Sequence, residues 1–303
     1  MTRPLVVGLG KVGVALTGLT ARLPELGADG GTAELAAVDL AVAPGVAVAV
    51  RAATALGCSG RVSGICATDP LGRFARALLG TAGIDVEGLT PWGDAAACTI
   101  TALDPQGRRL VLDHAGIDPE QGPPVVDVGG ALTNAGALLV DGSWMDAQVV
   151  AARAARARKI PVVVDVSDVV GGTGELVGLA DVLIASERVA AELAPRAELP
   201  DALAQMSALG PRAVIVTMGE AGAIGLHGQT LVQCPAFPVE ALDTSGAGSV
   251  FHGAFAAGLL SQLPLARCME LAAAAAALAC RGLGPWDGIP RREDVVDLVR
   301  TRG

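Results

Sequence analysis

A short polar run, residues 243–249, comes directly before an apolar, alanine-rich segment that is expected to form a buried helix. The run reads Asp-Thr-Ser-Gly-Ala-Gly-Ser, and its small residues let a ligand approach the backbone closely. The first N–H groups of a helix have no intrahelical partner and lie at its positive dipole end. We therefore expect Gly246, Ala247 and Gly248 to form an anion hole, for which phosphate is the usual guest. The competing interpretation is an ordinary glycine-rich helix cap.

A second glycine turn, residues 216–222, follows an apolar run of strand length and reads Val-Thr-Met-Gly-Glu-Ala-Gly. In open α/β sheets, ligands bind beyond the carboxyl ends of the strands. Residues 216–222 and 243–249 are therefore expected to converge on one site. The pair of turns is more informative than either turn alone.

A third glycine cluster, residues 8–13, has the form G-x-G-x-x-G directly after a predicted strand. This pattern admits a dinucleotide-binding interpretation, in which a pyrophosphate lies on a helix N-terminus. Asp39 is the best candidate for the acid that binds the ribose, but it lies later in the chain than the spacing of about 20 residues requires. A structural glycine turn is the competing interpretation, and an NAD(P)-binding Rossmann enzyme is the remote alternative.

Apolar runs of strand length alternate with helix-like segments along most of the chain, which predicts a mostly parallel sheet covered on both faces. The predicted strands are 4–8, 61–66, 136–141, 160–166, 182–185 and 212–217, and the predicted helices are 46–56, 71–82, 146–158, 187–193, 201–209, 246–260, 265–281 and one from 292. Residues 95–113 instead predict a hairpin around Asp-Pro-Gln-Gly, and residues 32–42 are expected to join the same small sheet. Such a flap suggests a lid over an active site.

Composition excludes several classes of function. The 303 residues carry a net charge of −9 without a basic run, which argues against nucleic acid and anionic membranes as partners. Although 51% of the residues are hydrophobic, charges, Gly and Pro interrupt the apolar runs before they reach membrane-spanning length. No signal peptide is recognisable, so a cytoplasmic protein is expected. The six cysteines form no C-x-x-C pair, and the three histidines are far apart in sequence.

Taken in order, these motifs resemble the PfkB or ribokinase family of carbohydrate kinases. The matching elements are V-T-x-G-x-x-G at 216–222, D-T-x-G-A-G at 243–248, L-G at 56–57, D-P-x-G-R at 104–108, the strand end at Asp165 and Gly-Ile-Pro in the tail 280–290. The F-H-G-A sequence at 251–254 resembles the branch that contains 6-deoxy-6-sulfofructose kinase. The resemblance implies one domain, 1–303, with a three-layer α/β/α fold. It also implies a small antiparallel β lid from about 14–43 and 93–118, and a homodimer that pairs these lids.

The resemblance further implies ATP-dependent phosphoryl transfer, with Mg²⁺, to a hydroxyl of a sugar-like or nucleoside-like acceptor. The anion hole at Gly246, Ala247 and Gly248 would hold the transferring phosphoryl group. The implied nucleotide-binding positions are Thr217, Gly219, Gly222, Ser186 and Glu187, and the implied metal positions are Glu187 and Glu192. The implied substrate positions are Gly13 and Gly45. Asp141 and Asp165 at predicted strand ends and His252, one helical turn after Ser249, are further substrate candidates, and a packed or capping histidine is the commoner interpretation of His252.

The sequence departs from the family where the chemistry should occur. Ser249 occupies the position of the catalytic aspartate, and a serine hydroxyl does not take up a proton near neutral pH. Asp243 is a substitute base or, as is commoner in such turns, a cap for local N–H groups. Gly13 stands where a substrate-binding aspartate is usual, and residues 42–49 offer no polar side chain to a polyol. The N-x-x-E element that helps to position Mg²⁺ reads Ser-Glu-Arg-Val at 186–189.

Three functions remain open on the sequence. The first is a small-molecule kinase in which another group or the substrate supplies the base. The second is a pseudokinase that binds a nucleotide or a small anion and acts as a binding or regulatory partner. The third is an enzyme that uses the same cleft and anion hole for chemistry other than phosphoryl transfer. All three place the ligand in the same pocket.

Overall fold

A computed structural model describes residues 3–25, 30–43, 45–116 and 125–302. Within them, twelve strands form one continuous hydrogen-bonded system, whose main path is β12-β11-β10-β9-β8-β7-β1-β3-β4. The strands are β1 (Leu5–Thr20), β2 (Leu35–Ala43), β3 (Ser59–Cys66), β4 (Leu89–Pro91), β5 (Cys98–Leu103), β6 (Arg109–His114), β7 (Ala135–Val140), β8 (Val162–Val166), β9 (Val182–Ser186), β10 (Ala213–Thr217), β11 (Ala223–His227) and β12 (Thr230–Cys234). Strands β4 to β10 along this path are parallel, and β11 and β12 are antiparallel.

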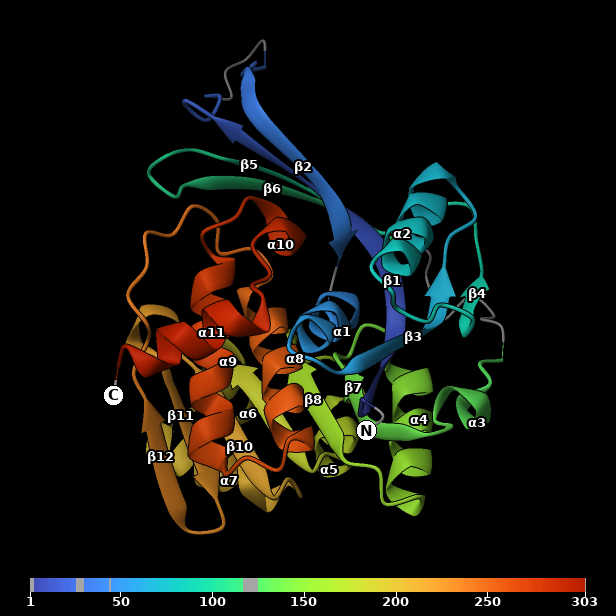
Figure 1. The fold of residues 1–303 in the computed structure, drawn as a ribbon, viewed down its shortest axis with the longest axis vertical. Helices are drawn as coiled ribbons and strands as arrows, with labels where there is room; N and C mark the ends of the chain where they lie inside the picture. The colour runs from blue at the N-terminus through green and yellow to red at the C-terminus, as the bar shows by residue number, and fades with distance from the viewer. Residues whose placement is uncertain (1–2, 26–29, 44, 117–124, 303) are drawn as a thin grey trace.

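Helices cover both faces of the main sheet, so the predicted three-layer α/β/α arrangement is confirmed (Figure 1). The helices are α1 (Val46–Ala55), α2 (Pro70–Thr81), α3 (Val128–Ala131), α4 (Met145–Ala157), α5 (Thr173–Gly178), α6 (Glu187–Leu193), α7 (Leu199–Ala208), α8 (Ala247–Leu260), α9 (Leu265–Ala279), α10 (Gly284–Asp287) and α11 (Arg292–Arg300), with a 3₁₀ turn η1 (Gly219–Ala221). One core packs α1, α2, α8, α9 and α11 against the sheet, and a second core packs α4, α5, α6 and α7 against the other face. Helix α8 is apolar on nearly every side and is accordingly buried along most of its length.

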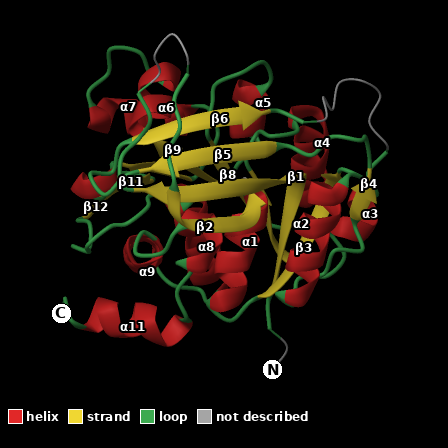
Figure 2. Ribbon diagram, turned by 90° about the horizontal axis from the view of Figure 1, so that it is seen from above, coloured by secondary structure: helices red, strands yellow, loops and turns green. Residues whose placement is uncertain are grey.

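The longest strand, β1, links the main sheet to the lid. Its first half pairs in parallel with β3 and β7, whereas its second half pairs with β2 and β5. The lid strands therefore lie in the order β2-β1-β5-β6, and Figure 2 shows them side by side from above. The predicted hairpin is confirmed as β5 and β6, and the strand predicted at 32–42 is confirmed as β2. Residues 26–29 and 117–118 of the predicted lid segments lie outside the described residues.

Both interpretations of the cluster Gly8–Gly13, as a dinucleotide-binding turn and as a structural turn, are wrong. These glycines lie inside β1, and no helix directly follows them. They permit close packing within the strand. A Cβ on Gly10 would come within 2.9 Å of Ser143 Oγ, and one on Gly8 within 2.7 Å of a Val50 methyl group. Asp39 pairs with Thr17 in the lid instead of ending the second strand of a βαβ unit.

Strands β11 and β12 were not predicted. They form an antiparallel hairpin at the edge of the main sheet, after the glycine turn at 219–222. In the part of the chain that the structure describes, no helix is both long and apolar enough to cross a membrane.

Candidate active site

Four predicted site residues lie along one edge of the main sheet. Strands β7, β8, β9 and β10 are neighbours in this order and run parallel. Asp141 follows β7, Asp165 is the penultimate residue of β8, Ser186 ends β9 and Thr217 ends β10. The predicted substrate positions at β7 and β8 and the predicted nucleotide positions at β9 and β10 therefore lie at the carboxyl ends of neighbouring strands, where open α/β sheets bind ligands.

The first turn of α8 has the features of an anion site. Its N-cap, Gly246, has a left-handed backbone (φ 77°), and no side chain among the described residues caps the helix. The N–H groups of Gly248 and Ser249, in the first turn, lack intrahelical partners. A Cβ on Gly248 would meet no atom within 4 Å, so space is open beside the backbone, whereas one on Gly246 would lie 2.7 Å from the Pro285 side chain.

Asp243 caps N–H groups of the loop that precedes α8. One carboxylate oxygen accepts a hydrogen bond from the N–H of Ser245 (2.9 Å), and the other accepts one from the N–H of Gly284 (2.9 Å). The side chain is buried. The geometry thus agrees with the capping role, one of the two roles that the sequence left open, and it ties the turn before α8 to the start of α10.

The predicted nucleotide turn is a tight connection between β10 and β11. The Met218 N–H donates to the Gly222 carbonyl (2.8 Å), and both Gly219 (φ 54°) and Gly222 (φ 92°) have positive φ values. A Cβ on Gly222 would overlap the Cys234 carbonyl, whereas one on Gly219 would meet nothing within 4 Å. Gly222 is therefore needed for packing, and Gly219 leaves open space beside the turn.

The predicted metal positions lie on α6, next to this turn. Ser186 caps α6 by accepting from the Val189 N–H (3.4 Å), and Glu187 is exposed in the first helical turn. The Glu192 carboxylate instead pairs with Arg188 (2.8 Å), which also pairs with Asp168 (2.8 Å). Among the described residues, no group of three His, Cys, Asp or Glu side chains is arranged to hold a metal ion.

Asp141 is the centre of a buried polar network. Its Oδ2 accepts from the N–H of Val46 (3.0 Å), and its Oδ1 accepts from the N–H of Ser143 (2.9 Å) and from Nε2 of Gln148 (2.8 Å). The same Gln148 nitrogen donates to the Leu9 carbonyl (2.7 Å). A carboxylate from β7 thus caps the N-terminus of α1 and fixes it against β1 and α4.

Two predicted substrate positions are glycines because their neighbours fill the space. A Cβ on Gly13 would overlap the Ala97 carbonyl, and one on Gly45 would overlap Asp141 Oδ2. No side chain can therefore occupy position 13 without moving the lid strand that begins at Cys98. Pro44, next to Gly45, lies outside the described residues.

Asp165 and His252 face each other below the first turn of α8. His252 is fully buried; its Nε2 lies 3.1 Å from the Val163 carbonyl and its Nδ1 lies 3.9 Å from Asp165 Oδ2. Burial lowers the pKa of His252 to about 4. Burial, and then the nearby Asp141 carboxylate, raise the pKa of Asp165 to about 7.

Sequence reasoning missed Gln148. It shares the buried face of α4 with Ala151, Ala152 and Ala155, a spacing of three, four and seven residues. A glutamine at such a position must find hydrogen-bond partners in the core. The helical periodicity of α4 is therefore the sequence signal that could have identified Gln148.

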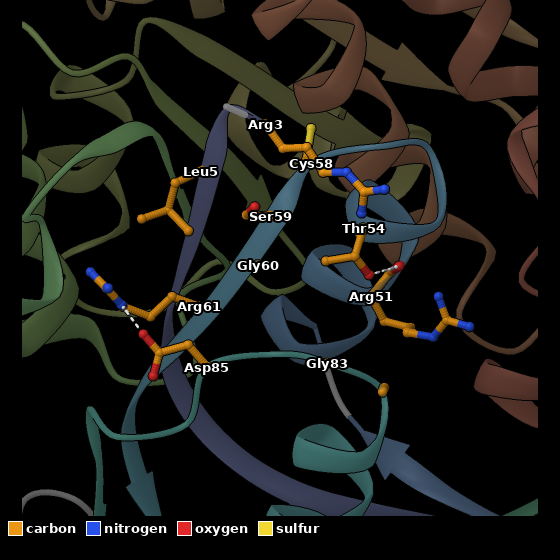
Figure 3. Close-up of a pocket in the computed structure, with 11 residues that line it drawn as sticks. Arg3, Leu5, Arg51, Thr54, Cys58, Ser59, Gly60, Arg61, Gly83 and Asp85 are labelled. Atoms are coloured by element: carbon orange, nitrogen blue, oxygen red, sulfur yellow. Dashed lines mark hydrogen bonds and ion pairs between the residues drawn. The ribbon is translucent and has the colours of Figure 1, made fainter. Parts of the chain in front are cut away.

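A cavity of about 470 Å³ opens at the opposite edge of the sheet, where β1 and β3 begin (Figure 3). None of the predicted site residues lines it. Arg61, one of three arginines that line it, already binds Asp85 (2.6 Å) and the Ala131 carbonyl (3.1 Å). The cavity therefore lies apart from the edge at which open α/β sheets bind ligands.

Comparisons with known proteins agree with this geometry. The profile described as pfkB family carbohydrate kinase matches residues 44–292. The ATP-dependent ribose-1-phosphate kinase of Halopiger xanaduensis is 32% identical over 215 residues, which cover 69% of this chain and 70% of that protein. The ribokinase of Lactococcus lactis is 34% identical over 121 residues, or 40% of this chain and 39% of that protein.

The match spans about two fifths of the length of the Lactococcus lactis and Bacillus subtilis ribokinases and 56% of the Arabidopsis thaliana enzyme. Two solved structures share the fold over 98–99% of this chain and 99% of their own. Arabidopsis thaliana ribokinase complexed with ribose and ATP has a TM-score of 0.83 at 24% sequence identity. Thermotoga maritima ribokinase has a TM-score of 0.82 at 20% sequence identity. The predicted ribokinase-like fold is confirmed. The chain belongs to the pfkB family of carbohydrate kinases.

Proposed function

We propose that this protein is an ATP-dependent kinase that transfers a phosphoryl group to a hydroxyl of a small, carbohydrate-like acceptor. The observation that carries this proposal is the first turn of α8. Its N–H groups are uncapped by side chains, and a glycine leaves space beside them. One helical turn further along α8, His252 lies 3.9 Å from Asp165 at the carboxyl end of β8. Such a turn stabilises the charge that develops on a transferring phosphoryl group.

The surrounding residues fit a nucleotide. The open backbone at Gly219 would admit the nucleotide beside β10, and the first turn of α8 would hold its terminal phosphate. When bound, Mg²⁺ neutralises negative charge on the phosphates. In this chain Glu187 would bind the hydrated ion, because its carboxylate is exposed in the first turn of α6 whereas Glu192 is engaged by Arg188.

The acceptor side is less polar than a sugar site requires. The N-terminal turn of α1 consists of valine and alanine residues, and the N–H of Val46 in this turn already donates to Asp141. We propose that the acceptor's polar contacts come mainly from Asp165 at the end of β8. Ribose, 2-deoxyribose, ribose 1-phosphate and fructose 6-phosphate are the first acceptors to test, since kinases for such compounds are among the relatives. The likeness of residues 251–254 to the sulfofructose kinase branch stays a prediction.

A nucleotide-binding pseudokinase is the second candidate, favoured by the serine at position 249. Both candidates predict that ATP with Mg²⁺ raises the melting temperature. Only the kinase releases ADP in proportion to an added acceptor. An enzyme that uses the cleft for other chemistry would instead bind apolar ligands without a nucleotide effect. The cytoplasmic location stays a prediction from the sequence.

Gly248→Glu is expected to abolish the rise in melting temperature that ATP and Mg²⁺ produce. At a hundred times the dissociation constant that rise corresponds to about 2.7 kcal/mol, and a carboxylate beside the anion hole repels the phosphate. Gly174→Glu is the matched control. Gly174 is likewise the second residue of a helix whose N-cap is a left-handed glycine, and its Cβ also meets no atom within 4 Å.

The measurement is thermal unfolding with ATP, ADP or a non-hydrolysable ATP analogue, each with Mg²⁺. A nucleotide shift that is equal in both variants would place the phosphate elsewhere. The absence of any nucleotide shift in the wild type would contradict the proposed function itself.

We also propose that the protein forms a homodimer through the lid. Six large apolar side chains on the lid strands are more than a third exposed: Leu35, Val38, Leu40, Ile100, Val111 and Leu112. A sheet with open edges and exposed apolar side chains is a surface that a second copy can cover. Leu112→Glu is expected to convert the dimer to a monomer in sedimentation velocity, whereas Val150→Glu, at an equally exposed valine on α4, is expected to leave it unchanged. A monomeric wild type at micromolar concentration would rule the dimer out.

A further inference from the structure

His252 presents an unpartnered nitrogen to the site. A carbonyl oxygen only accepts hydrogen bonds, so the contact between His252 Nε2 and the Val163 carbonyl requires the proton on Nε2. In the neutral ring, Nδ1 then carries a lone pair. This atom is buried and has no hydrogen-bond partner among the described residues. A buried polar atom of this kind is rare and calls for a partner.

The group nearest to this lone pair is the Asp165 carboxyl, 3.9 Å away. Side chains alternate along a strand, and Val163 packs in the core on the α8 side of the sheet. Asp165 therefore points to the same side, where its side chain is 16% exposed. The titratable groups that face it are Asp141 from β7 and His252 from α8, and its register partner in β9 is the apolar Ile184.

The helix directs this pair toward the position of Ser249. His252 lies three residues after Ser249, about one turn along the same side of α8. Side chains on a helix lean toward its N-terminus, so the His252 ring lies over the turn that carries Ser249 and the anion site. Asp165 is thus a carboxylate at the edge of the site in which position 249 lacks one.

We propose that Asp165 is the general base for the acceptor hydroxyl, and that the Nδ1 lone pair of His252 stabilises Asp165 once it has taken up the proton. This inference rests on the proposed kinase function. The acceptor oxygen forms a bond to the terminal phosphorus of a nucleoside triphosphate. The bond between this phosphorus and the bridging oxygen breaks, and its electron pair leaves with the nucleoside diphosphate. The hydroxyl proton passes to Asp165, which shares it with the His252 lone pair.

The electrostatics of the pair suit this task. A general base works best when its pKa lies near the working pH, and burial together with Asp141 raises the pKa of Asp165 to about 7. The His252 lone pair stabilises the protonated carboxyl further, because it accepts the new O–H. His252 itself stays neutral throughout, since burial lowers its pKa to about 4.

Four proteins test the inference: wild type, Asp165→Asn, Ser249→Asp and the double variant. The readout is kcat for acceptor-dependent ADP release with ATP and Mg²⁺, using the four acceptors named above, with the nucleotide-induced melting shift as the folding control. Asp165→Asn is expected to lower kcat by about 10²–10⁴-fold and to keep the melting shift. Adding Ser249→Asp to Asp165→Asn is expected to raise kcat at least tenfold above that of Asp165→Asn alone, because a carboxylate returns to the position of the family's catalytic aspartate.

The pH profile of wild-type kcat provides a second readout, which requires no variant to fold. Wild-type kcat is expected to rise with pH through about 7, as Asp165 loses its proton. His252→Gln keeps a donor for the Val163 carbonyl and replaces the basic ring nitrogen by a much less basic amide oxygen, so it is expected to shift this rise to lower pH. A purely structural histidine would leave the midpoint unmoved.

The outcomes are distinguishable. If the wild type turns over and Asp165→Asn leaves kcat unchanged, or if the wild-type profile is flat between pH 5.5 and 8.5, the inference is overturned and the kinase function stands. Turnover that appears only with Ser249→Asp also overturns it, because the chain then holds a nucleotide site without a base. If none of the four proteins shows turnover, and none shows a nucleotide-induced melting shift, the proposed function fails as well.

Discussion

Replacing Asp141 by alanine is expected to lower the free energy of unfolding by about 3–5 kcal/mol. The Asp141 carboxylate accepts three hydrogen bonds, from the N–H groups of Val46 and Ser143 and from the Gln148 amide. Its removal leaves these buried or partly buried donors without their acceptor, and each such loss costs about 1–3 kcal/mol before the structure relaxes. The α1 N-terminus would also lose the negative charge that its dipole favours.

Urea denaturation monitored by circular dichroism measures this change. Asp146→Ala is the matched control, because Asp146 is an exposed aspartate in the first turn of α4 and its loss is expected to cost at most about 1 kcal/mol. Asp141→Asn should fall between the two, since the amide keeps one acceptor oxygen. Equal stabilities of Asp141→Ala and Asp146→Ala would show that water replaces the carboxylate without cost.

The second large effect concerns the pH dependence of stability. The contributions of Asp165 and His252 to this dependence are expected to cancel in the wild type. Between about pH 4 and 6.5 the folded state holds one proton in this pair, on Asp165 (pKa about 7), while His252 (pKa about 4) is neutral. The unfolded chain also holds one proton in this range, on the histidine, whose ordinary pKa is 6.5, while the aspartate is ionised. Stability changes with pH only when the two states bind different numbers of protons, so the pair contributes no slope.

Removing either partner is expected to unmask the other. With Asp165→Asn only the depressed pKa of His252 remains, so stability is lost as pH falls from 6.5 to about 4, by up to about 1.4 kcal/mol per pH unit. With His252→Gln only the raised pKa of Asp165 remains. Its stabilising contribution is complete below the ordinary pKa near 3.8 and is lost as pH rises toward 7, with a similar limiting slope.

The measurement is the difference in unfolding free energy between each variant and the wild type at several values between pH 4.5 and 6.5. This difference removes the contributions of all other titrating groups. The two variants should therefore diverge from the wild type with slopes of opposite sign. Parallel curves for all three proteins would mean that Asp165 and His252 keep their ordinary proton affinities in the folded state.

Most of the elements of this fold follow from the sequence, because local patterns fix them. The apolar runs and helical periodicities predicted β3, β7, β8, β9, β10 and the longer helices to within a few residues, and Asp-Pro-Gln-Gly predicted the lid hairpin. Strand β1 was predicted to end at residue 8 but continues to Thr20, and the short elements β4, α3, α5 and α10 were not predicted. The antiparallel strands β11 and β12 were missed, because β12 (Thr-Leu-Val-Gln-Cys) offers only a weak alternation. The glycines at 8–13 were misread as a turn, because G-x-G-x-x-G describes residue types and not the neighbours that approach them.

The local geometry at the start of α8 was also determined locally, since glycine in the left-handed conformation and an uncapped helix start depend on a few consecutive residues. The sequence likewise indicated that position 249 lacks a base. Only the tertiary structure decided which side chains surround that position. Asp141 binds the N–H of Val46 from 95 residues away along the chain, and Asp165 meets His252 from 87 residues away. Such contacts depend on strand order and on burial, which set hydrogen-bond partners and pKa values between segments that no local pattern connects.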